Sequence, residues 1–159
     1  MNLEHFILEE YDFEKEVHID LKNSLINSEG SELISKDISN YIVKNYHLHQ
    51  RDGITNTYVV IYDKEMIGLA FVNYHPEEEI RGKLLPEEIE IGVGLLSKYR
   101  GKQIGSTLER ELSDALLERY SRFNIVVARI EGSNVRSIKS ALSAGFEYIK
   151  DDEYHYRRK

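Results

Sequence analysis

The chain of 159 residues contains no cysteine, no tryptophan and only two prolines. Without cysteine it forms no disulfide, binds no metal through thiolates and uses no cysteine as a nucleophile. It also lacks a run of about 20 apolar residues, the length needed to cross a membrane as a helix. These absences exclude disulfide-rich scaffolds, thiolate metal sites and thiol enzymes, and we expect no membrane partner.

Positive charge is also scarce. Lys and Arg number 21 against 28 Asp and Glu, which gives a formal net charge of −7 at pH 7. A nucleic-acid binder needs a net basic face, so we expect no nucleic-acid partner. The acidic start of the chain is not followed by an apolar segment, unlike a secretory signal peptide. We therefore expect a cytoplasmic protein.

The most informative stretch is residues 87–120. Its first part alternates charged and apolar residues as a strand does, and its last part places an apolar residue at every fourth position, at Ile104, Leu108, Leu112 and Leu116. The turn between them contains two glycines and two cations. Backbone N–H groups at a helix start have no intrahelical partner and the helix dipole is positive there, so this turn indicates a phosphate site. The alternative is an ordinary helix start with solvated charges.

The turn carries a family resemblance. Its residues Arg100-Gly101-Lys102-Gln103-Ile104-Gly105 resemble the Arg/Gln-x-x-Gly-x-Gly/Ala pyrophosphate loop of the GNAT N-acetyltransferases. A later segment, Asn134-Val135-Arg136-Ser137-Ile138-Lys139 followed by Ala144-Gly145-Phe146, is similar to that family's Asn-x-x-Ser/Ala-Ile…Gly-Phe motif. The order and spacing of the two motifs match the family pattern, and the resemblance spans the chain in outline.

The resemblance implies that acetyl-CoA is the cosubstrate. The loop would hold its pyrophosphate through Arg100, Gly101, Lys102, Gln103, Ile104, Gly105 and Ser106. Its pantetheine arm would bond to Asn134 and to the backbone at Val93, Gly94 and Leu95, where one N–H would polarise the thioester carbonyl. Asn134 is equally suited to capping its helix. The glycines at 92 and 94 indicate a bulge, a close ligand approach or saved space in a crowded core.

The resemblance also implies a general base on the central strand. Glu88 and Glu90 alternate with isoleucines, so both carboxylates lie on one face of the strand. An ammonium has no lone pair for attack, and a carboxylate can remove its proton directly or through a water. Glu90 is our first candidate and Glu88 the second, with a solvated strand face in a Glu-rich chain as a comparably strong alternative.

Two positions depart from the family pattern. Gln103 stands where the loop has its first glycine, and Ala141 stands where the family often has a tyrosine that protonates the departing thiolate. The general acid is therefore unassigned. Tyrosines 148, 154 and 156 fit packing roles better, and none of the six histidines has metal-ligand spacing, so we expect surface histidines and no metal site.

The expected fold is a single α/β domain over residues 1–159, with a GNAT-like mixed sheet. Its N-terminal strands are antiparallel, its centre is parallel and splayed, and helices cover both faces. We expect strands at residues 3–11, 57–62, 66–72, 88–95, 124–130, 146–149 and 154–156, and helices at 12–21, 31–42, 104–120 and 134–144. Residues 75–87 form a polar, acidic connection.

The function implied is transfer of the acetyl group from acetyl-CoA to an amine by direct attack. The Ser137-Ile138-Lys139 version of the late motif resembles the branch that acetylates protein N-termini, and small-molecule amines stay open. The alternative is a non-catalytic acyl-CoA-binding regulatory domain, or an interaction module without a cofactor. The sequence leaves the oligomeric state open, a homodimer included.

Overall fold

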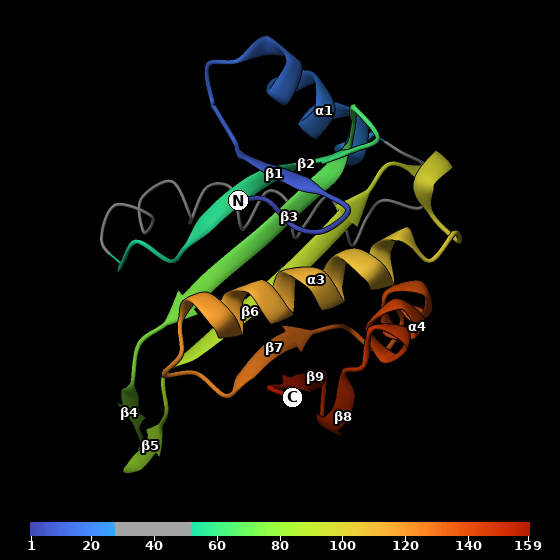
Figure 1. The fold of residues 1–159 in the computed structure, drawn as a ribbon. Helices are drawn as coiled ribbons and strands as arrows, with labels where there is room; N and C mark the ends of the chain where they lie inside the picture. The colour runs from blue at the N-terminus through green and yellow to red at the C-terminus, as the bar shows by residue number, and fades with distance from the viewer. Residues whose placement is uncertain (28–51) are drawn as a thin grey trace.

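The computed structural model describes residues 1–27 and 52–159. Its sheet has the strand order β1-β2-β3-β6-β7-β9-β8 (Figure 1). The strands are β1 (Ile7–Glu10), β2 (Asn56–Tyr62), β3 (Glu65–His75), β6 (Glu88–Leu95), β7 (Ile125–Arg129), β8 (Glu147–Lys150) and β9 (Glu153–Arg157), with β4 (Glu78–Ile80) and β5 (Lys83–Leu85) in a separate hairpin. The helices are α1 (Glu16–Ile26), η1 (Ser97–Tyr99), α3 (Ile104–Arg119) and α4 (Val135–Ala144). The helix expected at residues 31–42 lies outside the described residues.

The mixed sheet confirms the expected fold class. Strands β1, β2, β3 and β6 pair antiparallel in sequence order, and a two-residue turn at Asp63 and Lys64, both with positive φ, joins β2 to β3. Such turns match the twist of the strands that they connect. The one parallel pair among the described strands is β6 with β7.

That parallel pair is splayed, as expected. Only Ile89 with Val126 and Glu90 with Val127 are in register, although β6 continues to Leu95 and β7 to Arg129. Beyond Glu90 the two strands therefore diverge. The gap opens toward the first turns of α3 and α4, which follow these strands in the chain.

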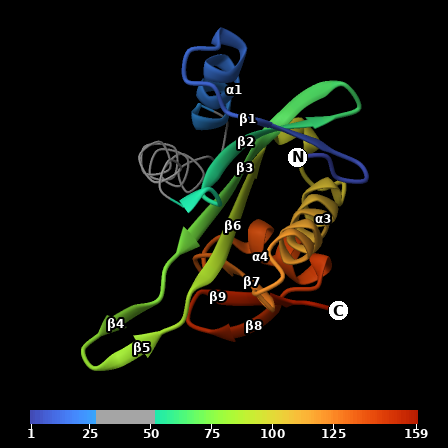
Figure 2. The same ribbon diagram turned by 60° about the vertical axis from the view of Figure 1, so that its left-hand side comes forward.

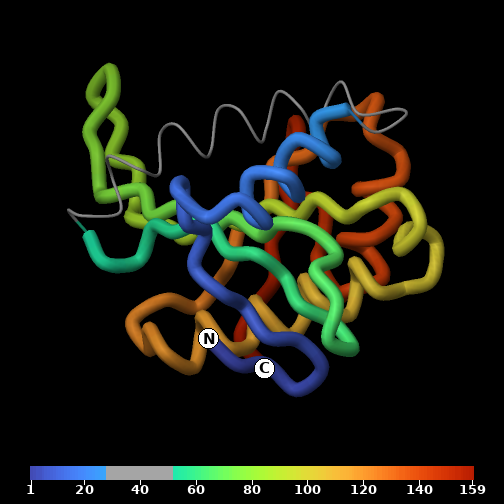
Figure 3. The backbone as a smooth tube through the Cα atoms, turned by 90° about the horizontal axis from the view of Figure 1, so that it is seen from above, coloured from blue at the N-terminus to red at the C-terminus, as the bar shows by residue number. Residues whose placement is uncertain are grey.

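Helices cover both faces of the sheet. The predicted apolar stripe of α3 is confirmed, because Leu108, Leu112 and Leu116 are almost completely buried in the main core, together with Ala141 of α4. On the other face, Leu25 of α1 packs with a second cluster of strand residues. Figure 3 shows α1 and α3 on opposite sides of the strands. None of the described helices has the length and apolar character to span a membrane.

The acidic connection after β3 contains two strands that the sequence did not predict. They form the hairpin β4–β5, which projects from the sheet (Figures 1 and 2) and turns at Arg81 and Gly82, both with positive φ. All residues of its two strands are exposed. Strands without a buried face show no apolar alternation, which is why the pattern did not reveal them.

The N-terminal segment departs from expectation in three details. Strand β1 is shorter than residues 3–11. Asp12 does not cap the helix; its Oδ1 accepts the N–H of Glu14 in a turn before α1 begins at Glu16. His18 is 1% exposed rather than on the surface, because its ring bonds the backbone N–H of Asp12 through Nδ1 and the carboxylate of Glu9 through Nε2.

Candidate active site

The loop before α3 has the geometry of an anion site. Gly101 has φ +74° and Gln103 has φ +61°, so both lie in the left-handed region. Gln103 is the residue just before α3, and in the described structure no side chain caps this helix. The N–H groups of the first turn therefore face outward without side-chain partners, at the positive end of the helix dipole.

A cavity of about 990 Å³ opens beside this loop, between the end of β6 and the start of α4. It brings together most of the residues predicted to bind the cofactor: Val93, Gly94, Leu95, Arg100, Gly101, Gln103, Gly105, Ser106 and Asn134. The cavity lining does not include Lys102 or Ile104. Lys102 is exposed to solvent, and Ile104 packs against the main core.

Cations from two elements border this cavity. The Nε of Arg100 donates to the carbonyl oxygen of Leu95 at 3.0 Å. Burial lowers the pKa of Arg100, and the nearby charge of Arg136 lowers it further. Two guanidiniums that disfavour each other's charge would be stabilised by an anion between them.

The α4 residues Arg136 and Lys139 line the same cavity, although no role was predicted for them. They lie three residues apart, so they share one face of the helix. This three-residue spacing of two cations next to Asn134 is visible in the sequence. It indicates an anion site only when α4 is known to lie beside the loop.

A second, smaller cavity occupies the gap between the diverging strands. Gly92 lines it from β6, and Ala128 and Arg129 line it from β7. The pairing of β3 with β6 has no register shift, so Gly92 does not mark a bulge there. A Cβ at Gly92 would meet Phe71 at 3.5 Å, an ordinary contact, so crowding does not require this glycine either. Neither a bulge nor crowding therefore requires glycine at this position, and a close ligand approach stays a prediction.

Asn134 lies where the two cavities meet. Its Oδ1 accepts the N–H of Ser137 at 3.3 Å, which confirms the capping role that its position suggested. The same residue lines both cavities. The predicted contact with a cofactor is therefore compatible with capping.

The two candidate bases lie on one face of β6, as expected, and share a guanidinium. Nη1 of Arg129 lies 2.6 Å from Glu88 and 3.0 Å from Glu90, while its Nη2 lies 3.4 Å from Glu153. Burial lowers the pKa of Arg129, but the hydrogen bond to Glu88 and the charges of all three carboxylates outweigh it and raise the pKa overall. Arg129 thus occupies the place that a cation would take among these carboxylates.

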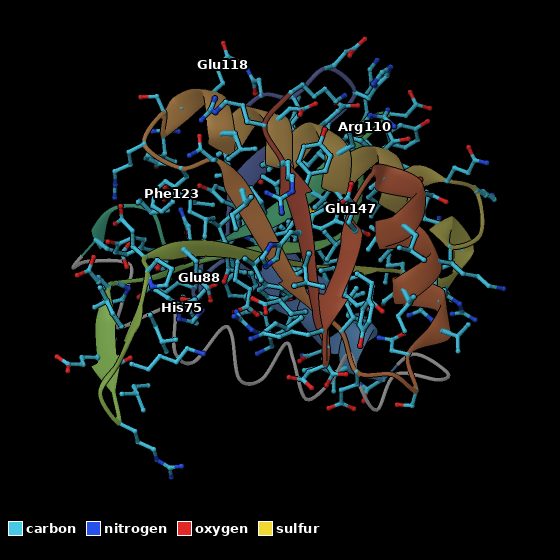
Figure 4. All side chains as sticks on the ribbon, turned by 90° about the horizontal axis from the view of Figure 1, so that it is seen from below. His75, Glu88, Arg110, Glu118, Phe123 and Glu147 are labelled. Atoms are coloured by element: carbon cyan, nitrogen blue, oxygen red, sulfur yellow. The ribbon has the colours of Figure 1, made fainter. Side chains whose placement is uncertain are left out.

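His75 joins this cluster, although it was expected on the surface without a role. Register places His75 of β3 opposite Glu88 of β6, and the two lie close together in Figure 4. The Nε2 of His75 is 2.8 Å from Oε1 of Glu90. The side chain of His75 is 41% exposed and that of Glu90 only 7%, so a ligand reaches the imidazole more easily than the carboxylate.

The match to a family model decides the family. The model described as the acetyltransferase (GNAT) family matches residues 22–146, most of the chain. The chain belongs to the GNAT acetyltransferase family. This confirms the resemblance drawn from the two motifs. Comparison with curated protein sequences gives no match.

Solved structures agree with the GNAT fold. An acetyltransferase from Agrobacterium tumefaciens is 14% identical, with a TM-score of 0.72 and coverage of 99% of this chain and 94% of that one. The enzyme AAC(6')-Ib in complex with paromomycin and acetyl-CoA is 18% identical, with a TM-score of 0.68 and coverage of 98% and 94%.

A third structure, the ribosomal L7/L12 α-N-protein acetyltransferase RimL in complex with coenzyme A, is 20% identical, with a TM-score of 0.64 and coverage of 97% and 94%. At these identities the likeness concerns the fold.

Proposed function

We propose that this acetyltransferase transfers the acetyl group of acetyl-CoA to a cationic amine. The continuity of the site carries this proposal. The larger cavity begins at Arg100 and the open first turn of α3 and shares residues with the smaller cavity between β6 and β7. The smaller cavity reaches Arg129, whose guanidinium contacts both Glu88 and Glu90. A phosphate site and a narrow passage thus follow one another, and the cluster of candidate proton acceptors adjoins the end of this passage through Arg129.

The cofactor would lie along that path. Its phosphates would meet the N–H groups of α3 together with Arg100 and Arg136, because charge-assisted bonds to guanidinium are strong and often bidentate. The pantetheine arm would pass Asn134 and the backbone of Val93 and Gly94. A backbone N–H at this point would stabilise the negative charge that develops on the thioester oxygen during attack.

The charge of the acidic cluster favours a cationic acceptor. Three carboxylates, Glu88, Glu90 and Glu153, surround one guanidinium, which leaves a net charge of 1 − 3 = −2 with His75 neutral. The exposed hairpin β4–β5 adds no net charge, because Arg81 and Lys83 balance Glu78 and Glu79. Such a field attracts an ammonium and favours an acceptor with several positive charges.

The amine must lose a proton before or during its attack. In this proposal His75 takes the proton, and Glu90 at 2.8 Å holds the ring and stabilises the imidazolium that forms. Glu90 thereby assists proton removal indirectly, and the more exposed imidazole of His75 contacts the amine. Glu88 stays with Arg129 and supplies negative charge to the acceptor site.

Release of the CoA thiol tests this proposal. The chain contains no cysteine, so a thiol reagent reports CoA without background from the protein. Ribostamycin, a polycationic amine, and a peptide with a free N-terminus serve as acceptors. We expect turnover with the polycation to exceed that with the peptide, and Glu90→Gln to lower kcat by about 100-fold, within the usual range for acid–base catalysis.

The control for this assay is Glu118→Gln, which removes an exposed carboxylate near the end of α3 (Figure 4). It should keep wild-type turnover. Equal turnover in Glu90→Gln and wild type would contradict the part of Glu90 in proton removal. Preference for the peptide would contradict the polycationic acceptor and point to protein N-termini instead.

A further inference from the structure

Glu109 occupies a position that the proposed chemistry leaves unused. It lies on α3, four residues after Gly105 and on the same side of the helix. Among the described residues, four line both cavities: Val93, Glu109, Asn134 and Ser137. Two of the others, Val93 and Asn134, are expected to contact the reactive end of the cofactor. Glu109 therefore borders the point where the thioester would lie.

The surroundings of Glu109 favour its neutral form. Burial raises the pKa of this carboxyl to about 7, although the hydroxyl of Ser140 donates a hydrogen bond to Oε1 at 2.7 Å, which lowers it. The charged groups that line the two cavities with Glu109 come from the loop, α4 and the end of β7; they are Arg100, Arg136, Lys139, Arg129 and Glu131. A bound cofactor would add negative phosphates to this set and raise the pKa of Glu109 further.

Acetyl transfer needs a proton at this place. An alkyl thiol has a pKa near 8.5, so a departing thiolate is more stable once it is protonated. The tyrosines considered at the C-terminus do not line either cavity. Tyr148 is exposed, the ring of Tyr154 is buried, and the hydroxyl of Tyr156 donates to Asp114 at 2.7 Å. Glu109 is the one carboxyl among the described residues that line the larger cavity.

We propose that Glu109 donates the proton that converts the departing CoA thiolate to a thiol. This inference rests on the proposed binding of acetyl-CoA in these cavities. The C–S bond of the tetrahedral intermediate breaks and its electron pair moves to sulfur. The O–H bond of Glu109 breaks as the S–H bond forms. The ammonium loses two protons on its way to the amide: one goes to His75 before or during attack, and the other leaves the tetrahedral intermediate for solvent. The carboxylate left on Glu109 regains a proton from solvent.

Proton uptake on cofactor binding tests this inference without any acceptor. At pH 8 the free carboxyl of Glu109 is largely ionised, and an anionic ligand beside it should draw a proton from solvent. Calorimetric titration of acetyl-CoA in two buffers of different ionisation enthalpy measures that proton. We expect wild type to take up more protons than Glu109→Gln, by a fraction of a proton that increases with the rise in the pKa of Glu109. The control Glu118→Gln, at an exposed site on the same helix, should match wild type.

The outcomes separate the two proposals. Binding of acetyl-CoA with equal proton uptake in wild type and Glu109→Gln would overturn the role of Glu109 and leave the proposed function standing. Failure of wild type to bind acetyl-CoA would overturn both. The amide oxygen of glutamine can still accept the hydrogen bond of Ser140, so the variant should fold with an unchanged melting temperature.

The pH profile of turnover supplies the second test. A proton donor must be protonated, so kcat of wild type should fall as the pH rises through the pKa of Glu109 in the complex. Glu109→Gln should lower kcat about 100-fold at neutral pH, leave KM for acetyl-CoA unchanged and lose that alkaline decline. A wild-type kcat and profile in the variant would overturn the inference, and a rise in KM alone would mean that Glu109 serves binding.

Discussion

Truncation of Arg129 should destabilise the fold through the carboxylates that it leaves behind. Its guanidinium lies 2.6 Å from Glu88, 3.0 Å from Glu90 and 3.4 Å from Glu153, and Glu90 is only 5% exposed. Removal of one partner from a fully buried ion pair costs about 3–5 kcal/mol. The side chain of Arg129 is 41% exposed, so water compensates part of the loss. We therefore expect Arg129→Ala to lower the free energy of unfolding by about 3 kcal/mol.

Thermal and denaturant unfolding check this magnitude. With an unfolding entropy of about 2.1 cal/mol/K per residue, a loss of about 3 kcal/mol lowers the Tm of a chain of this length by about 9 °C. The loss of stability caused by Arg129→Ala should be smaller in a Glu90→Gln background, because one of the carboxylates left without its partner is then absent. A loss below about 0.5 kcal/mol, or one unchanged by Glu90→Gln, would refute the view that Arg129 compensates this cluster.

Three further predictions concern the loop, a pH-dependent contact and the central strands. Gln103→Gly should raise the free energy of unfolding by up to about 1 kcal/mol, because glycine adopts the positive φ of this residue without a Cβ penalty; a loss of stability in denaturant titration would contradict this. The hydrogen bond of His5 to Glu111 raises the pKa of His5, so its stabilisation is complete below the unfolded-state pKa of about 6.5 and is lost as the pH rises through the higher folded-state value. The Tm difference between wild type and His5→Gln should therefore shrink between pH 6 and 9, and a difference that grows with pH would contradict a raised pKa of His5. Gly68→Ala should cost several kcal/mol, because a Cβ there would overlap the carbonyl oxygen of Gly94 across β3 and β6, and near-native stability of the purified variant would mean that these strands can separate.

Local signals explain what the sequence could predict. The four-residue apolar spacing of α3 and the left-handed Gly145 that ends α4 depend on nearby residues, and both are present in the structure. The glycine-bearing loop and Asn134 were recognisable for the same reason, and nearly all the residues assigned to them line one cavity. Lys102 and Ile104 were the exceptions, because a loop motif does not specify which side chains turn toward solvent or into the core.

Tertiary pairing explains what the sequence could not predict. His75 meets Glu90 only because β3 and β6 pair in one particular register, and Arg129 reaches the same carboxylates only because β7 lies parallel to β6. No spacing of residues along the chain predicts these contacts. Glu109 was hidden for a similar reason, since its cavity exists only where α4 packs beside α3.

Calorimetric titration of acetyl-CoA into wild type and the Arg100→Ala/Arg136→Ala double variant tests the central claim most directly. Each lost bond to a charged group costs about 1.5–3 kcal/mol, so two lost bonds should weaken binding by about 100-fold or more. Lys98→Ala, an exposed cation of η1 outside the cavity, should bind as wild type does. Tight binding lost in the double variant and kept in Lys98→Ala is the predicted result. Wild-type affinity in the double variant, or no binding to wild type at millimolar ligand, would contradict a cofactor site between β6, α3 and α4.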